Sequence, residues 1–338
     1  MPGLNKPVLQ ADLSGRTVLV LGANTGIGLE AAKHYARMGA KVIGACRSEA
    51  KCAETVEVIK KETGSLLIEG RVIEMSDFAS VKAFADRWEK DGGDLDILVA
   101  NAAVATYDYN TTVDGYENSV QINHLSSALL TLLLLPHLLK TAQKKGTLAR
   151  VVAVSSTTYK GVALGHERVP AGSKIIPTLS SDEDMTNRYA ESKLLNLLFT
   201  RALRSHLPRP PTLPLLITSV CPGFCQSSLR RTVEERFRLT YPPGVYDENV
   251  RNARTSEEGS RQLVIASVGP DPRKLDDLEV TTVMDGGFVS DSEVEEVSEW
   301  VRSEEGREAQ KKVFEETLEI LAKVDPRVIQ VSKDILTL

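Results

Sequence analysis

Short apolar runs alternate with segments of helical periodicity along most of the chain. The runs are rich in valine, leucine and isoleucine and have no polar face, which is typical of strands buried on both sides of a parallel sheet. The segments between them repeat apolar residues at helical spacing and end near glycine, which is typical of amphipathic helices. The pattern predicts strands at 17–21, 41–46, 71–75, 95–101, 150–156 and 214–223. It predicts one helix that follows the first strand and ends at Gly39, and further helices at 49–63, 81–90, 116–140, 187–206, 256–267 and 304–324.

Alternating strands and helices joined by short links predict a doubly wound α/β fold, in which a parallel sheet lies between two layers of helices. Two long stretches, 157–186 and 226–255, interrupt the alternation. Both follow the carboxyl end of a predicted strand, where open α/β sheets bind ligands, and loops of this length are uncommon unless they are functional. We therefore expect one domain over 14–325 with these stretches as substrate-loop insertions, and a C-terminal tail at 326–338.

Composition and charge narrow the possible functions. The 338 residues carry a net charge of −5, so no basic field favours nucleic acid or an anionic membrane. The most apolar segment, 128–139, is broken by Thr131 and Pro136 and is shorter than the roughly 20 residues that span a bilayer. The first residues lack the pattern of a signal peptide, and the histidines and cysteines are not spaced as metal ligands. We expect a cytoplasmic protein without a membrane anchor, a metal ion or a nucleic-acid partner.

A glycine-rich turn follows the first predicted strand and opens the first predicted helix. Its glycines allow a tight turn, let backbone N–H groups approach a pyrophosphate, and let the helix pack closely on the strand. The helix N-terminus adds a positive dipole end that attracts the anion. An ordinary turn is the alternative, but the strand–turn–helix context favours a dinucleotide site. The turn residues expected to bind the cofactor are Gly22, Asn24, Thr25, Gly26, Ile27 and Gly28.

The end of the second strand bears on the choice between NAD and NADP. A carboxylate at this place would bind the adenosine ribose hydroxyls and repel a 2′-phosphate. This chain instead has Cys46 followed by Arg47, and an arginine can bind the 2′-phosphate with charge-assisted hydrogen bonds. Unless Arg47 is an ordinary solvated surface arginine, it favours NADP(H).

Tyr189 and Lys193 place a phenol and an ammonium four residues apart, on one face of a predicted helix. The ammonium and a cationic nicotinamide both favour phenolate, so a hydroxyl whose pKa is ordinarily near 10 could exchange a proton near neutrality. An ordinary amphipathic helix is the alternative. Ser156 closes the fifth predicted strand, with Ser155 as the runner-up, and Asn123 is a polar residue among leucines that could instead be a satisfied core amide.

In their order along the chain, these motifs resemble the short-chain dehydrogenase/reductase family, and within it the retinol-dehydrogenase-like and fungal-type reductases. The glycine spacing matches the family, Asn101-Ala102 resembles its strand-end asparagine motif, and Pro222-Gly223 resembles its segment beside the nicotinamide. The resemblance covers roughly residues 14–226. It implies a Rossmann fold with the helices and sheet in three layers.

The resemblance also implies residue roles. Tyr189 would act as the catalytic acid/base, Ser156 would polarise the substrate carbonyl, Lys193 would hold the ribose and bias the tyrosine, and Asn123 would hold a water in a proton relay that reaches the lysine. The further cofactor contacts that it implies are Glu74 and Met75 beside adenine, Asn101 and Ala102 in the adenosine site, Pro222 and Gly223 beside the nicotinamide, and Ser227 at the carboxamide or phosphates.

The implied reaction is reversible hydride transfer between NADP(H) and a carbonyl or secondary alcohol. The alternatives are a regulator that senses NADP without turnover, and a sugar-nucleotide epimerase on a similar scaffold. Relatives also imply a homodimer formed through the helices at 116–140 and 187–206. Apolar side chains in the two long stretches suggest a lipid-like, terpenoid, aromatic or polyketide substrate of secondary metabolism; they are Tyr159, Leu164, Ile175, Ile176, Leu229, Phe237 and Tyr241.

Overall fold

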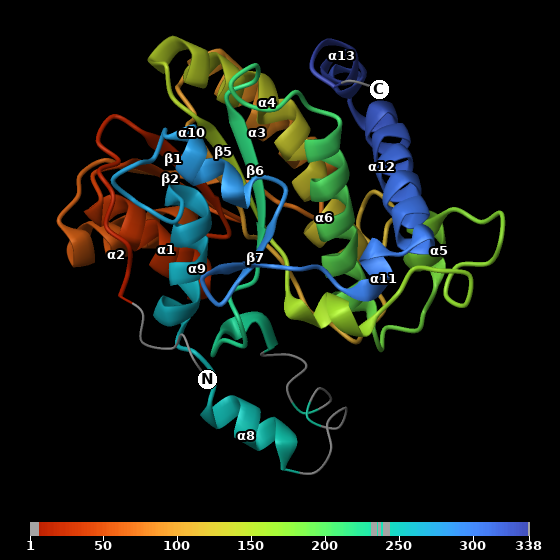
Figure 1. The fold of residues 1–338 in the computed structure, drawn as a ribbon. Coiled ribbons are helices and arrows are strands. Elements are labelled where there is room, and N and C mark those ends of the chain that lie inside the picture. Colours follow the sequence, from red (N-terminus) through yellow and green to blue (C-terminus); the bar gives the residue numbers. More distant parts are fainter. Residues whose placement is uncertain (1–6, 231–234, 236–237, 239–243, 337–338) are drawn as a thin grey trace.

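An eight-stranded sheet forms the centre of the protein (Figure 1). The computed structural model describes residues 7–230, 235, 238 and 244–336. The strand order is β3-β2-β1-β4-β5-β6-β7-β8, and neighbouring strands are parallel except β7 and β8. The order reverses between β1 and β4, as in a doubly wound sheet, so the predicted fold class is confirmed. The strands are β1 (Thr17–Leu21), β2 (Lys41–Cys46), β3 (Ile68–Val72), β4 (Ile97–Ala100), β5 (Ala149–Val154), β6 (Leu215–Val220), β7 (Phe288–Ser290) and β8 (Glu293–Glu295).

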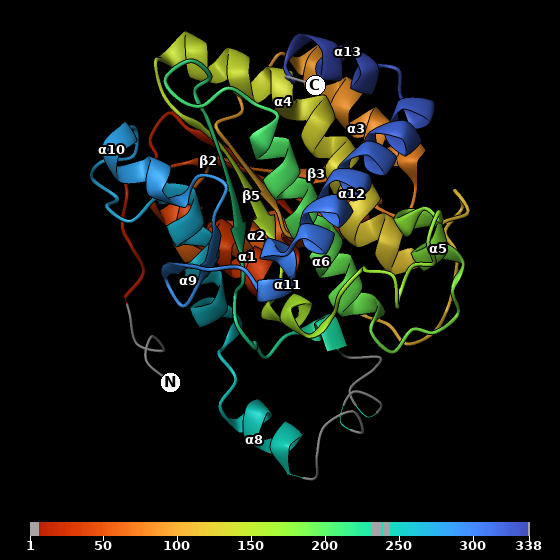
Figure 2. The same ribbon diagram turned by 45° about the vertical axis from the view of Figure 1, so that its right-hand side comes forward.

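Different helices cover the two faces of the sheet (Figures 1 and 2). Side chains alternate between the faces of a strand, and β1 shows the consequence. Val18 and Val20 join a core with the first set of helices, whereas Leu19 and Leu21 join a larger core with the second set. The first set is α1 (Gly26–Arg37), α2 (Glu49–Thr63) and α9 (Ser256–Val268), and the second is α3 (Phe78–Asp91), α4 (Ser126–Lys145) and α6 (Arg188–Ser205).

Strand β3 lies earlier in the chain than the predicted range of 71–75. It pairs with β2, with Ile68 opposite Val42 and Val72 opposite Cys46. Because β3 is the edge strand, its residues are all half-buried, and it lacks the continuous apolar run that reveals a central strand. The apolar residues that suggested the later range, Ile73 and Met75, are buried in the segment after the strand.

The predicted helix at 116–140 begins as a π-helix, η1 (Val120–Leu125), and continues as α4. By length and hydropathy the helical segment Val120–Lys145 could cross a membrane, but 78% of its most apolar window is buried inside the protein. Its leucines pack on the sheet and on neighbouring helices. Burial of this kind is typical of a core helix.

Two C-terminal helices, α12 (Glu304–Val324) and α13 (Arg327–Asp334), lie over α6 and α4 (Figure 2). Val313, Phe314 and Leu321 of α12 belong to the large core that includes α6. As a result α4 and α6 are buried over most of their circumference within one chain. These are the two helices through which the homodimer was expected, and that expectation stays a prediction.

Several short elements were not predicted, because each is too short to show a periodic apolar pattern. Strands β7 and β8 extend the sheet after α9 and form a hairpin. Segment 326–338, expected as a tail, contains α13. The remaining elements are η2 (Thr157–Gly161), α5 (Ile175–Ser181), η3 (Ser228–Arg230), α8 (Val245–Arg251), α10 (Leu278–Thr281), η4 (Thr282–Met284) and α11 (Glu299–Arg302).

Candidate functional site

The glycine-rich turn forms a tight cradle between β1 and α1. Gly22 and Gly26 have φ of 72° and 59°, in the left-handed region that other residues rarely adopt. A Cβ added at Gly28 would overlap Gly22 O and lie 2.5 Å from Asn101 Nδ2. Asn101 Nδ2 donates to Leu21 O at 2.9 Å and so holds the end of β4 against the turn. A turn of this shape fits a dinucleotide pyrophosphate, because its glycines let the backbone approach the phosphates and let α1 pack closely on β1.

The N-terminus of α1 is suited to an anion. Its first turn carries no acidic residue, and the cap residue Thr25 makes no side-chain hydrogen bond to the helix. Ser227 and Ser256 lie close by, since a Cβ at Gly26 would be 3.6 Å from Ser227 Cβ and 3.9 Å from Ser256 Oγ. Ser256 was not among the predicted cofactor residues, because its place in the sequence, far from the glycine turn, gave no signal.

At the end of β2, Arg47 is exposed and Cys46 is buried. Burial raises the pKa of the Cys46 thiol, so no anion stands at this place. Glu74 lies beyond the end of β3 and is engaged in its own turn, where Ser76 N and Ser76 Oγ donate to Glu74 Oε1 at 3.0 and 2.9 Å. Met75 is buried, and its carbonyl accepts Ser126 Oγ at 2.6 Å. The predicted adenine contacts of Glu74 and Met75 stay predictions.

Tyr189 and Lys193 lie in the first two turns of α6. Lys193 Nζ is 5.7 Å from the centre of the Tyr189 ring and donates to Val154 O at 2.8 Å. Burial of this ammonium lowers its pKa to about 8, so it stays mostly charged at neutral pH. The helix N-terminus adds a positive dipole end beside the phenol. The lysine and the dipole both favour the anionic form of a hydroxyl at this place.

The two adjacent serines have different surroundings. Ser155 is buried, and its hydroxyl donates to Lys193 O at 2.9 Å, which fixes α6 to the end of β5. Ser156 is partly exposed and caps η2, where its Oγ accepts from Thr158 N at 3.3 Å and lies 3.0 Å from Thr158 Oγ1. Ser156 is therefore the strand-end serine whose hydroxyl opens toward the surface.

Asn123 lies in the π-helix and makes three side-chain hydrogen bonds to the protein. Its Oδ1 accepts from Val104 N at 2.8 Å, and its Nδ2 donates to Val104 O and Ser192 Oγ, both at 2.9 Å. The amide thus connects the segment after β4 to α6, one residue before Lys193. Its expected role in holding a water stays a prediction.

Pro222 and Gly223 follow β6 and contact an arginine that the sequence analysis missed. Gly223 has φ of 82°, and Arg254 Nη1 donates to Pro222 O at 3.0 Å. A Cβ at Gly223 would lie 2.5 Å from that same nitrogen. Arg254 is buried and pairs with Asp291 in the β7–β8 hairpin. Only the fold brings these segments together, so the sequence offered no signal for Arg254.

Several side chains expected in an apolar substrate pocket belong to the core instead. Tyr159, Leu164, Ile175 and Ile176 are buried in the large hydrophobic cluster, and Tyr159 packs edge-on against Phe288 at 5.2 Å between ring centres. Leu229 is half-buried. Phe237 and Tyr241 lie outside the described residues.

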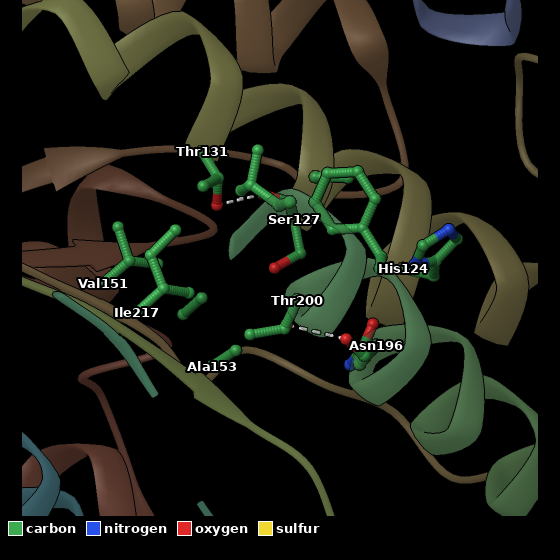
Figure 3. Close-up of a pocket in the computed structure, with 12 residues that line it drawn as sticks. His124, Ser127, Thr131, Val151, Ala153, Asn196, Thr200 and Ile217 are labelled. Carbon is green, nitrogen blue, oxygen red and sulfur yellow. Dashed lines mark hydrogen bonds between the residues drawn. The ribbon is translucent and has the colours of Figure 1, made fainter. Parts of the chain in front are cut away.

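A small cavity with a mostly apolar lining lies behind the site, between the sheet and the helices α4 and α6 (Figure 3). Its volume is about 20 Å³, enough for one water. The figure shows His124, Asn196 and Thr200 around it. His124 Nε2 is 2.9 Å from Thr317 Oγ1, which itself donates to Val313 O, so Nε2 carries the ring proton. His124 Nδ1 is then an acceptor, and the side chain of Asn196 lies within hydrogen-bonding reach of the ring.

This buried histidine predicts a loss of stability in acid. Burial lowers the pKa of His124 to about 4, whereas an unfolded histidine titrates near 6.5. The unfolded chain therefore takes up a proton below about pH 6.5 that the folded chain takes up only near pH 4, which lowers the free energy of unfolding by about 2 kcal/mol between pH 7 and pH 5. Urea unfolding at the two pH values should show this loss, and His124→Gln should reduce it. His166→Gln, at an exposed histidine, is the control; an equal effect there would contradict the assignment.

Comparison with known proteins gives the class to which this site belongs. Residues 16–167 match the family model described as short chain dehydrogenase. A short chain dehydrogenase of Arthrobotrys oligospora is 31% identical over 325 residues, which cover 93% of this chain and 94% of the relative. The chain belongs to the short-chain dehydrogenase/reductase family, and the predicted resemblance is confirmed.

Particular relatives indicate which members of the family the chain is similar to. The short chain dehydrogenase/reductase dmxR8 of Cryptosporiopsis sp. is 32% identical, with 95% of each chain covered. Retinol dehydrogenase 12 of Bos taurus is 36% identical over 65% of this chain and 64% of the relative, so the chain is retinol-dehydrogenase-like. Among solved structures, salutaridine reductase from Papaver somniferum superposes with a TM-score of 0.55 at 23% identity, covering 76% of this chain and 96% of that chain. This likeness concerns the fold.

Proposed function

We propose that the protein is an NADP(H)-dependent oxidoreductase that interconverts a carbonyl and a secondary alcohol, with Tyr189 as the acid/base. The observation that carries the proposal is the phenol of Tyr189 in the first turn of α6, with the buried ammonium of Lys193 5.7 Å from its ring. A phenol next to a buried cation is suited to proton exchange near neutral pH. A regulator that only senses NADP has no need of this pair.

The chain's residues would each act on a defined atom. When bound, the nicotinamide supplies or accepts the hydride at the substrate carbon. Tyr189 then donates its proton to the carbonyl oxygen, or accepts it in the oxidative direction. Ser156 donates a hydrogen bond to that oxygen, and Lys193 stabilises the phenolate that remains. Asn123 keeps the segment after β4 in place beside α6.

The cofactor would lie over the glycine cradle. The residues proposed to hold it are those named from the sequence, with Ser256 added beside Ser227. A short chain dehydrogenase of Shigella flexneri, solved in complex with NADP, superposes with a TM-score of 0.52 at 24% identity and covers 73% of this chain and 89% of that chain. This neighbour and the arginine at the end of β2 both support NADP(H) over NAD(H).

Exchanging the charge of Arg47 tests this preference. Arg47→Asp is expected to raise the Kd for NADPH at least about 30-fold, because it removes a charge-assisted bond to the 2′-phosphate and adds repulsion. The Kd for NADH should fall or stay the same, since a carboxylate can bind the ribose hydroxyls. Fluorescence titration measures both constants. Lys90→Asp, the same change of charge at an exposed position of α3, should alter neither, and an unchanged NADPH affinity in Arg47→Asp would contradict the role.

The substrate is proposed to be a small-molecule carbonyl that binds at the carboxyl edge of the sheet, beside Ser156 and Tyr189. Its apolar character stays a prediction, since most of the side chains that suggested it belong to the core. Fungal relatives of this chain support a place in secondary metabolism. The test is a panel of terpenoid, aromatic, lipid-like and polyketide ketones incubated with the purified chain and NADPH. Loss of NADPH absorbance with at least one ketone is expected. Tight NADPH binding without turnover on any of them would favour the sensing regulator.

We also propose that the protein works in the cytoplasm and as a single copy. The second point replaces the expected dimer, and it rests on the cover that α12 and α13 provide for α6 and α4.

A further inference from the structure

Five charged side chains form a network around the first turn of α6. Arg188 directly precedes Tyr189, and its side chain and that of Glu117 are both 0% exposed. Arg188 Nη1 is 3.4 Å from Glu117 Oε2, and Arg188 Nε is 3.1 Å from Glu191 Oε2. Removing such charges from water costs several kcal/mol for each ion, and an apolar pair of similar volume is often as stable. Stability alone is therefore a weak reason for this arrangement.

One end of the network fixes the start of the π-helix. The carboxylate of Glu117 accepts from Ser119 N at 2.8 Å and from Val120 N at 3.0 Å. These residues lead into η1, which carries Asn123. Because Asn123 in turn donates to Ser192 Oγ on α6, the π-helix contacts α6 on both sides of Tyr189.

The other end holds the last part of the stretch 157–186. Arg188 Nη2 donates to Asp182 O at 3.1 Å and to Asp184 O at 3.4 Å. Arg168 contacts Glu191, and Arg168 Nη1 is 2.7 Å from Asp182 Oδ2. A proposed substrate loop and the helix turn with Tyr189 are thus bound to the same guanidinium.

We propose that Arg188 and Glu117 are a positioning pair. The pair holds the phenol of Tyr189 in a fixed position relative to Asn123 on one side and to the stretch 157–186 on the other. The proposal rests on the proposed function and adds residues to it that touch neither substrate nor cofactor. A displacement of about 1 Å at a reacting group can cost about 100-fold in rate. The pair therefore acts on kcat, while the glycine cradle, which it does not contact, keeps its affinity for the cofactor.

The experiment separates positioning from stability. Arg188→Met alone leaves the Glu117 carboxylate buried beside no cation and should lower the melting temperature. The double variant Glu117→Gln with Arg188→Met removes both charges but keeps one acceptor oxygen, which can accept from either Ser119 N or Val120 N. Its melting temperature should return toward that of the wild type. We expect its kcat to stay at least about tenfold below wild type, with the Kd for NADPH within about twofold.

The same helix offers a matched control at its other end. Arg204 Nε and Asp285 Oδ2 form a buried ion pair at 3.0 Å, with side chains 2% and 1% exposed. Arg204→Met with Asp285→Asn makes an equivalent change far from Tyr189 and should leave kcat within about twofold. Recovery of kcat together with stability in the Glu117/Arg188 double variant would overturn the proposal, as would an equal loss of kcat in the control.

A conservative variant guards against misfolding of the double variant. Arg188→Lys keeps the cation but lacks the fork of donors that reaches Asp182 O, Asp184 O and Glu191. Its kcat should fall while its melting temperature changes little, and a wild-type kcat here would also overturn the proposal. All variants are compared with the wild-type kcat. Wild-type protein that binds NADPH but turns over no ketone would instead refute the proposed function, so the two failures are distinguishable.

Discussion

Tyr189→Phe is expected to lower kcat by about 10³-fold, because the hydroxyl that exchanges the proton is removed and its ring remains. The Kd for NADPH should change by less than about threefold, since the aromatic ring still fills its place beside Lys193. Steady-state kinetics with a ketone found in the panel, together with fluorescence titration of NADPH, measure the two quantities.

Tyr116→Phe provides the control for that variant. Tyr116 is half-buried in the segment before the π-helix and packs edge-on against Phe78 with ring centres 5.9 Å apart. Loss of its hydroxyl should leave kcat unchanged within about twofold. If Tyr189→Phe kept most of the wild-type kcat, another group would have to supply the proton, and the proposed mechanism would be wrong.

Gly28→Ala is expected to abolish NADPH binding over the accessible range, with a rise in Kd of at least about 100-fold. An alanine usually stabilises a helix relative to glycine by about 1 kcal/mol. Here its Cβ would overlap Gly22 O and crowd Asn101 Nδ2, so the turn, the end of β4 or the helix must move. Each of these movements distorts the backbone that would face the pyrophosphate. Fluorescence titration and thermal unfolding test this, and both affinity and melting temperature should fall.

Gly93→Ala is the matched substitution. Gly93 has no atom within 4 Å of an added Cβ and no positive φ, so an alanine there should change neither the affinity nor the melting temperature appreciably. An unchanged NADPH affinity in Gly28→Ala would mean that the cofactor does not use this turn.

The parts of the fold that the sequence predicted are those whose patterns are local. β1, β2 and α2 were predicted at their observed bounds, because their apolar patterns and terminal glycine or polar residues are contained in each segment. β3 was misplaced because an edge strand is half-exposed and its pairing with β2 sets its position. β7 and β8 span 3 residues each, too short for any period to show.

The residues of the candidate site were predicted or missed for the same reason. Tyr189 and Lys193 were found because a helix brings residues four apart onto one face. The glycine cradle was found because its glycines lie close together in one short segment between a strand and a helix. Arg188, Glu117 and Arg254 act through contacts between segments far apart in the sequence. A buried arginine and a surface arginine look the same in a sequence, so only the fold distinguishes them.

The cover that α12 and α13 place over α6 and α4 has a thermodynamic consequence. When a second copy buries such a face, mass action makes the stability of the protein depend on its concentration, and each association loses translational and rotational freedom. In this chain the covering helices are covalently attached and are present at a fixed effective concentration. If the protein works as a single copy, as proposed, the core behind Tyr189 and Lys193 is complete in each molecule, and its stability should not change on dilution.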